Sequence, residues 1–182
     1  MTQGFQTAMM APGVEDILNI TLMPFGNAVY NKTLGGKLVC QHGEMECLGN
    51  SLLQCAIDLY PNQARHTPFA MCFEKHGPDF WDHKDAEHVL SYAEECANEV
   101  FLDPVAIKSC ATDPVRSAAL QKKYYELTKL KRGAFPKVYY LTYVLVNGKK
   151  SPTDGAQLLD EVCAAYTGTK PVGCSTNTTT GA

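Results

Sequence analysis

Eight cysteines spread over most of the chain constrain its fold more than any other feature of the sequence. They are Cys40, Cys47, Cys55, Cys72, Cys96, Cys110, Cys163 and Cys174. None of their spacings is CxxC, so no neighbouring pair forms a zinc knuckle or a thioredoxin-type dithiol. An even set without such a motif favours four disulfide bonds and no free thiol. Of the many possible pairings, we expect Cys96–Cys110, joining two neighbouring helices, and Cys163–Cys174, tying the last helix to its tail.

Three Asn-x-Ser/Thr triplets, at Asn19, Asn31 and Asn177, predict sites of N-glycosylation. Glycans and disulfides both belong to the oxidising secretory pathway, so we expect a lysosomal or extracellular location. The first residues, MTQGFQTAMMAPG, have neither the basic region nor the apolar region of a signal peptide. A leader segment is therefore expected upstream of Met1.

Length, charge and hydropathy exclude several classes of protein. A chain of 182 residues with 45% hydrophobic residues can build one domain with a sizeable core. The net charge of -3 provides no broad basic field, which argues against general nucleic-acid binding. No stretch approaches the roughly 20 apolar residues that a membrane-spanning helix needs.

The first forty residues carry short extended segments after an initial helix. Residues Phe5–Met10 read as the end of an amphipathic helix that Pro12 and Gly13 close. Alternating polar and apolar residues predict a strand over Ile17–Met23. Two glycines between extended runs predict a hairpin within Val29–Cys40, because glycine accepts positive φ at both turn positions.

The middle of the chain, Cys47–Leu130, has the apolar spacing of helices and no strand-like run. Two Asp-Pro pairs within it mark helix starts, because the carboxylate caps the free N–H groups and proline suits the first helical position. These pairs are Asp103-Pro104 and Asp113-Pro114. We interpret this block as a helical insertion.

The last third predicts a hairpin and a terminal helix. Val138–Val146 is the most β-prone segment, and Asn147-Gly148 is a strong hairpin turn signal. Apolar residues on one face predict a helix over Asp154–Tyr166. The order of elements predicts a single α/β domain over residues 1–174, stabilised by disulfides, and a disordered or glycan-bearing tail over residues 175–182.

The segment CQHGEMECLGNSLLQC between Cys40 and Cys55 is more specific than any periodicity. It resembles the signature of the gamma-interferon-inducible lysosomal thiol reductase (GILT) family. The fixed positions of that signature are matched by Cys40, Gln41, His42, Gly43, Glu46, Cys47, Asn50 and Cys55. Further segments that resemble the family are LNITLMPFGNA at Leu18–Ala28, VNGK at Val146–Lys149 and KPVGC at Lys170–Cys174.

The resemblance implies a thioredoxin-like fold with a helical insertion and reduction of disulfides in endocytosed proteins, without a cofactor. The family uses a CxxC dithiol at the start of the first helix, where the helix dipole stabilises the attacking thiolate. Because a helix is already under way at Phe5, that dithiol would fall at or immediately before Met1. We therefore expect no catalytic residue within these 182 residues.

Thioredoxin-like enzymes usually carry a cis-proline on the strand that faces the dithiol, where it shapes the edge that docks the substrate. Counted back from Asn147-Gly148, that position is Thr142, and Tyr143 follows it. Pro136 lies too far upstream to take its place. A cis bond before a residue other than proline costs about 2.5 to 4 kcal/mol, so we expect a trans peptide and an altered docking edge at Thr142 and Tyr143.

The signature allows three interpretations. Its cysteines are structural bridges with His42 and Glu46 as caps or hydrogen-bond partners, or they take part in catalysis, or Cys40, His42 and Cys47 bind a metal. We favour the structural bridges and expect no metal site, because a fourth ligand at zinc-finger spacing is missing.

A second polar group is interpreted as solvated loop residues rather than as a metal site. Its members are His76, Asp79, His83 and His88, which surround Trp81. A Cys-His protease has no support, because disulfides account for all the cysteines.

Two functions remain after these exclusions. The chain is either part of a GILT-like oxidoreductase whose CxxC lies upstream, or a redox-inactive relative that binds unfolded or disulfide-containing protein or serves as a structural glycoprotein. The absent leader segment favours the first function, and Thr142 favours the second.

Overall fold

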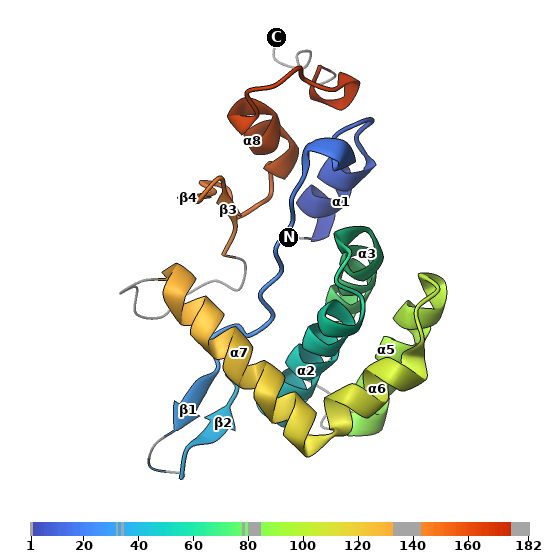
Figure 1. Cartoon of the computed structure of the whole chain (residues 1–182), viewed down its shortest axis with the longest axis vertical. Helices are drawn as coiled ribbons and strands as arrows, with labels where there is room; N and C mark the ends of the chain where they lie inside the picture. Colours follow the sequence, from blue (N-terminus) through green and yellow to red (C-terminus); the bar gives the residue numbers. More distant parts are fainter. Residues whose placement is uncertain are drawn as a thin grey trace. The chain divides into compact units, whose positions relative to one another are not determined.

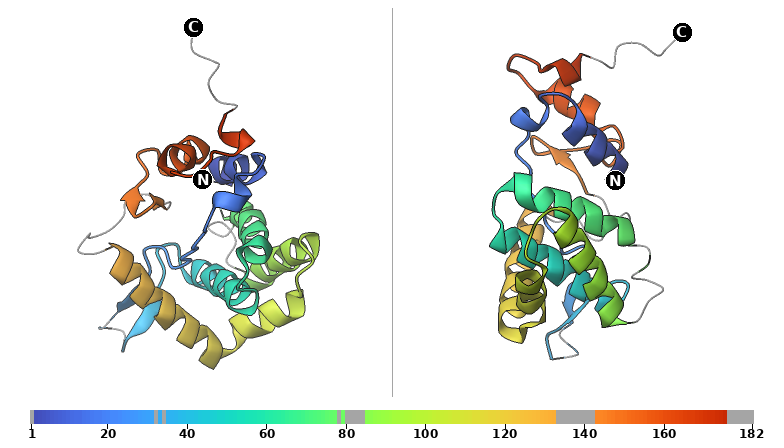
Figure 2. Two further views of the ribbon diagram at one scale, coloured as in Figure 1. Left: turned by 45° about the horizontal axis from the view of Figure 1, so that its top comes forward. Right: turned by 90° about the vertical axis from the view of Figure 1, so that its right-hand side faces the viewer.

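The computed structural model describes residues 2–31, 33, 35–77, 79, 85–132 and 143–175. The chain forms two compact units, of which the first combines Met1–Asn19 with Val138–Ala182 and the second is Ile20–Lys137. In Figures 1 and 2 the first unit is drawn in dark blue and in orange to red. The second unit is drawn in lighter blue through green to yellow.

The first unit places two helices and a short hairpin around a small apolar cluster. Its elements are α1 (Thr2–Met10), the 3-10 helix η1 (Glu15–Ile17), β3 (Leu145–Val146), β4 (Lys149–Lys150), α8 (Leu158–Ala165) and the 3-10 helix η4 (Val172–Cys174). Helix α1 packs against α8, and α8 also contacts β3 and η4. Ala8 and Val14 are fully buried in this cluster beside Leu158 and Leu159. The predicted helix before Pro12 is confirmed.

The hairpin of the first unit forms where the turn signal predicts it. Strands β3 and β4 pair antiparallel, with Val146 opposite Lys149. Asn147 and Gly148 have φ values of 48° and 78°, as a two-residue turn with positive φ at both positions requires. Of the predicted strand Val138–Val146, residues 138–142 lie outside the described residues.

The predicted helix over Asp154–Tyr166 is shorter at its start than expected. Helix α8 begins at Leu158, because Asp154 and Gly155 have positive φ values of 51° and 85°. This backbone turns the chain before the helix begins, and the Ser151 hydroxyl accepts a hydrogen bond of 2.9 Å from the Gly155 N–H. The spacing of apolar residues predicted an earlier start, because this spacing carries no information about such a turn.

The second unit is a bundle of helices with one hairpin. Its elements are β1 (Val29–Asn31), β2 (Lys37–Val39), α2 (Glu44–Leu59), α3 (Gln63–Phe73), the 3-10 helix η3 (Glu74–His76), α5 (Ala86–Glu99), α6 (Pro104–Thr112) and α7 (Pro114–Arg132). Helix α2 contacts the four helices α3, α5, α6 and α7 of this unit (Figures 1 and 2). Leu52, Phe69, Val89 and Ile107 are fully buried between them.

The helix starts and the hairpin of this unit confirm the local signals in the sequence. Asp103 accepts hydrogen bonds from the N–H groups of Val105 and Ala106, and Asp113 caps α7 in the same way. Val29 pairs with Val39 across the hairpin, whose turn contains Gly35-Gly36. The helical block predicted over Cys47–Leu130 is confirmed for its described residues.

The predicted strand over Ile17–Met23 is wrong. Ile17 ends η1, and residues 18–23 have no regular structure. Among the described residues no strand pairs with this segment, and the Ile20 N–H donates instead to the Gln63 side-chain oxygen at 2.6 Å. Alternating apolar residues favour a strand only where a neighbouring strand can accept the backbone hydrogen bonds.

The described residues contain two separate sheets of two strands each, so the fold is mixed and mostly helical. This architecture is consistent with the predicted α/β class at that level of detail. No helix in the described ranges is long and apolar enough to cross a lipid bilayer. Most of the predicted tail, residues 176–182, lies outside the described residues.

Candidate functional site

All eight cysteines form disulfide bonds, and none is free. The four bridges are Cys40–Cys47, Cys55–Cys110, Cys72–Cys96 and Cys163–Cys174. The predicted number of bridges is confirmed, and so is the pairing that ties α8 to η4. Since a disulfide sulfur is not a nucleophile, the oxidised chain holds no thiolate that could attack a substrate.

The predicted bridge Cys96–Cys110 is wrong. Cys96 on α5 bonds to Cys72 on α3, and Cys110 on α6 bonds to Cys55 on α2. Helix α5 packs against both α3 and α6, while α6 contacts α2 more extensively than any other helix. Cys96 and Cys110 are consecutive cysteines in the sequence, but each is therefore bridged to a cysteine on another helix.

The signature segment forms the junction between the hairpin and helix α2. Cys40 directly follows β2, and Cys47 lies on the first turns of α2, so their bridge closes the junction. Cys40 is buried at 5% exposure, while Cys47 is only half-buried. Gly43 stands immediately before α2 with a φ of 97°, a backbone region that favours glycine.

His42 and Glu46 form a hydrogen-bonded pair at the same helix start. The Glu46 carboxylate accepts the His42 backbone N–H at 2.6 Å and lies 3.0 Å from the ring Nδ1. A glutamate in the first turn that reaches back to a preceding N–H resembles a capping box, which fixes the entry of the chain into the helix. These two contacts of Glu46 with His42 therefore stabilise the start of α2.

The metal interpretation of Cys40, His42 and Cys47 is wrong for this structure. The two sulfurs are bonded to each other, and zinc requires thiolate ligands. Of the other signature residues, Gln41 accepts a hydrogen bond of 2.8 Å from the Asn27 amide. The Asn50 amide nitrogen is buried and has no hydrogen-bond partner among the described residues.

The predicted docking edge is described only in part. Thr142 lies outside the described residues, as does Pro136. Tyr143 is half-buried just before β3, and the Lys150 ammonium lies 5.9 Å from the centre of its ring. The role of this edge therefore stays a prediction.

The interpretation of the histidine-rich segment as solvated loop is wrong for His76. This residue ends η3, is half-buried, and stacks on Tyr92 with a distance of 4.1 Å between ring centres. His88 is exposed on α5, while Trp81 and His83 lie outside the described residues. Burial and the Asp79 carboxylate raise the pKa of Tyr92.

The predicted glycosylation sites differ in their surroundings. Asn19 is exposed. The Asn31 side-chain oxygen accepts hydrogen bonds from the Thr33 N–H at 2.9 Å and from the Thr33 hydroxyl at 2.6 Å. Asn177 lies outside the described residues.

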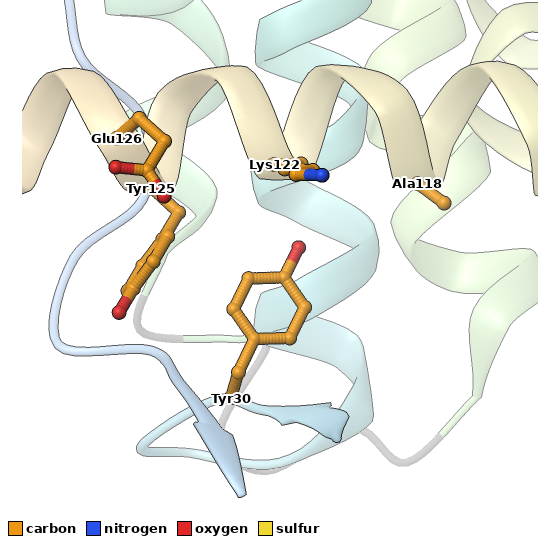
Figure 3. Close-up of a pocket in the computed structure, with 5 residues that line it drawn as sticks. All are labelled: Tyr30, Ala118, Lys122, Tyr125 and Glu126. Carbon is orange, nitrogen blue, oxygen red and sulfur yellow. The ribbon is translucent and has the colours of Figure 1, made fainter. Parts of the chain in front are cut away.

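An open pocket between the hairpin and α7 is a feature that the sequence reasoning missed. It has a volume of about 410 Å³ and is lined by Tyr30, Ala118, Lys122, Tyr125 and Glu126 (Figure 3). Tyr30 and Tyr125 meet edge to face, with 5.1 Å between their ring centres. Burial, and secondarily Tyr125, raises the pKa of Tyr30. The adjacent Tyr124-Tyr125 pair on α7 was the only signal for it, and such a pair indicates a core face equally well.

Comparison with known proteins identifies the family. The family model described as "Gamma interferon inducible lysosomal thiol reductase (GILT)" matches residues 1–100, more than half of the chain. A mouse protein named gamma-interferon-inducible lysosomal thiol reductase is 35% identical over 164 residues, which cover 89% of this chain and 60% of the relative.

Two further relatives agree with this match. A protein of the same name from Carassius auratus is 30% identical, over 88% of this chain and 61% of its own length. A gamma-interferon-responsive lysosomal thiol protein from Arabidopsis thaliana is also 30% identical, over 88% of this chain and 63% of its own. The chain thus spans 60 to 63% of the length of these relatives. On the family model and the signature together, the chain belongs to the gamma-interferon-inducible lysosomal thiol reductase family.

Proposed function

We propose that this chain is part of a thiol-disulfide oxidoreductase with a thioredoxin-like fold, which reduces disulfides in protein substrates in a lysosomal or extracellular compartment. The family match supports the reaction class, because relatives that match most of the chain are named thiol reductases. The observation that carries the proposal is the match of the family model to residues 1–100, while the eight bridged cysteines assign the thiol chemistry to a pair outside this set. These cysteines form the framework of the enzyme, and the attacking dithiol is a separate CxxC.

The reaction needs one attacking and one resolving thiol. The first cysteine of the dithiol attacks the substrate disulfide as a thiolate, forms a mixed disulfide and releases one substrate thiol. The second cysteine then displaces the other substrate thiol, so the enzyme ends with a new disulfide and the substrate with two thiols. We place this CxxC directly before α1, where the free N–H groups at the helix start lower the pKa of the attacking thiol.

The rest of the first unit supports such a site. Helix α1 is held against the segment before α8 so closely that a Cβ atom on Gly4 would lie 1.9 Å from the Gly155 carbonyl oxygen. A helix start fixed in this way can orient a reactive group. We assign the docking of substrate backbone to Thr142 and Tyr143, and N-linked glycans to Asn19, Asn31 and Asn177.

The test is an insulin-reduction assay on a chain extended by Cys-x-x-Cys directly before Thr2, with a dithiol regenerant. The matched control carries Ser-x-x-Cys, which keeps the resolving cysteine and removes the attacking one. We expect turnover from the extended chain and none from the control. Equal turnover from the two chains would overturn the assignment of the dithiol to this position.

A second function is a redox-inactive relative that binds unfolded or disulfide-containing protein. It is favoured by the absence of a free thiol in the oxidised chain and by Thr142 at the position where thioredoxin-like enzymes use proline. An extended chain that binds reduced, carboxymethylated insulin but reduces no disulfide would support this function over the first.

A further inference from the structure

Three metal-ligating side chains lie together where α3 and η3 meet α5. They are Cys72, His76 and Cys96, whose ligand atoms all lie within 4.8 Å of one another. In the part of the chain that the structure describes, this is the one group of three or more such residues with this spacing. The group is independent of the signature segment and of the position proposed for the dithiol.

A carboxylate lies beside one member of the group. The Glu99 Oε2 atom lies 3.3 Å from the Cys72 sulfur. Because the bridged sulfur carries no proton, this is a close approach of a carboxylate to sulfur rather than a hydrogen bond. Glu99 is exposed at the end of α5, so its side chain can rotate toward the other ligands at little cost.

The helices present these four side chains in two pairs. Cys72 and His76 are four residues apart across the end of α3 and η3, while Cys96 and Glu99 are three apart on α5. Residues at these spacings share one face of a helix, and α3 packs against α5. Stacking on Tyr92, with an angle of 14° between the rings, holds the His76 imidazole in a fixed orientation. The ligands are therefore partly preorganised.

We infer that reduction of the Cys72–Cys96 bridge creates a binding site for Zn²⁺ formed by Cys72, His76, Cys96 and Glu99. A dithiol reductant donates two electrons and two protons to the bridge, which yields two cysteine thiols and an oxidised dithiol. Zn²⁺ then displaces the two thiol protons and binds both sulfurs as thiolates. The bridge and the metal use the same sulfurs, so the two states exclude each other.

The chemistry of the ligands selects zinc. Two thiolates, one imidazole and one carboxylate are a donor set typical of tetrahedral Zn²⁺ and unsuited to Ca²⁺ or Mg²⁺. Bond lengths of about 2.0 to 2.3 Å place the ligand atoms of a tetrahedral site about 3.3 to 3.8 Å apart. The observed spacing, within 4.8 Å for three of the ligands, needs only small side-chain movements to reach this geometry.

Cobalt binding to the full chain tests the site. The protein is reduced with a phosphine and titrated with Co²⁺, whose visible spectrum reports tetrahedral geometry and whose near-ultraviolet bands report thiolate ligands. We expect one Co²⁺ per chain with both signatures, displaced by Zn²⁺, and no such spectrum from the oxidised protein. His76→Ala and Glu99→Gln should each weaken binding by about tenfold or more.

His42→Ala is the matched control, since His42 lies beside a different bridge and contacts Glu46. All three variants keep the eight cysteines, so the oxidised fold can be verified by circular dichroism before reduction. Equal Co²⁺ affinity in wild type, His76→Ala and His42→Ala would mean binding to unspecific thiols and would overturn the site. An unchanged affinity in Glu99→Gln alone would overturn the fourth ligand.

A second measurement covers loss of structure on reduction. If the reduced chain loses helical signal, Zn²⁺ should restore it in the wild type and not in His76→Ala, because a structural metal couples its binding to folding. Equal recovery in both proteins, or recovery in neither, would contradict the proposed site.

Discussion

The two bridges of α2 should contribute differently to stability, because they close loops of very different length. The perturbation is a pair of double variants, Cys55→Ala with Cys110→Ala, and Cys40→Ala with Cys47→Ala. The first bridge joins residues 55 apart in the sequence, and the second joins residues 7 apart. In the chain-entropy model these bridges stabilise the folded state by about 4 and about 2 kcal/mol respectively.

Burial acts in the same direction as loop length. Cys55 and Cys110 are 0% and 3% exposed, so their replacement also leaves space in the core of the second unit. Cys47 is half-buried, and its loss leaves less. We therefore expect the Cys55 and Cys110 variant to lose at least about 2 kcal/mol more than the other.

The assay is urea unfolding under non-reducing conditions, followed by circular dichroism and extrapolated to water. Free energies of unfolding are compared rather than midpoints, because removing a crosslink also exposes more surface in the unfolded chain. Both bridges lie in the same compact unit, so one transition reports both variants. An equal or larger loss in the Cys40 and Cys47 variant would refute the reasoning.

Three further predictions concern packing, pH and catalysis. Gly4→Ala should lower the free energy of unfolding by about 1 to 3 kcal/mol, because its Cβ would lie 1.9 Å from the Gly155 oxygen. Gln6→Ala, on the exposed face of α1, should change this free energy little in the same urea assay. Burial raises the pKa of the Glu74 carboxyl group above its ordinary 4.5. The protonated side chain therefore contributes fully to stability below pH 4.5, and this contribution is lost as the pH rises through the raised pKa. Glu74→Gln should accordingly raise Tm at neutral pH and leave it unchanged in acid, and an equal shift at both pH values would contradict this origin. In the chain extended by CxxC, Thr142→Pro should raise kcat/KM for insulin by up to about a hundredfold. Equal kcat/KM values for the extended chains with Thr142 and with proline would contradict an altered docking edge.

Local signals in the sequence predicted the elements that depend on neighbouring residues. Asp103 and Asp113 cap helices because a carboxylate needs only the next two or three N–H groups. Asn147-Gly148 forms its turn because both residues tolerate positive φ. The Cys163–Cys174 bridge was predictable for a similar reason, because it spans only 11 residues.

Features that depend on packing between distant segments were not predictable. The alternation of Ile17–Met23 indicated a strand, but no partner strand lies beside it among the described residues. Cys55 and Cys110 are 55 residues apart and meet only because α2 packs on α6. In the same way, His76 and Cys96 come together through the contact of α3 and η3 with α5, which no local spacing reveals.

The most direct test of the central claim is insulin reduction by the 182-residue chain itself, with a dithiol regenerant and without any added CxxC. Because every cysteine is bridged, we predict no turnover above the rate of the regenerant alone. Robust turnover that disappears when Cys40 and Cys47 are replaced by serine would contradict the account. It would make the half-buried bridge at the start of α2 a catalytic dithiol rather than part of the framework.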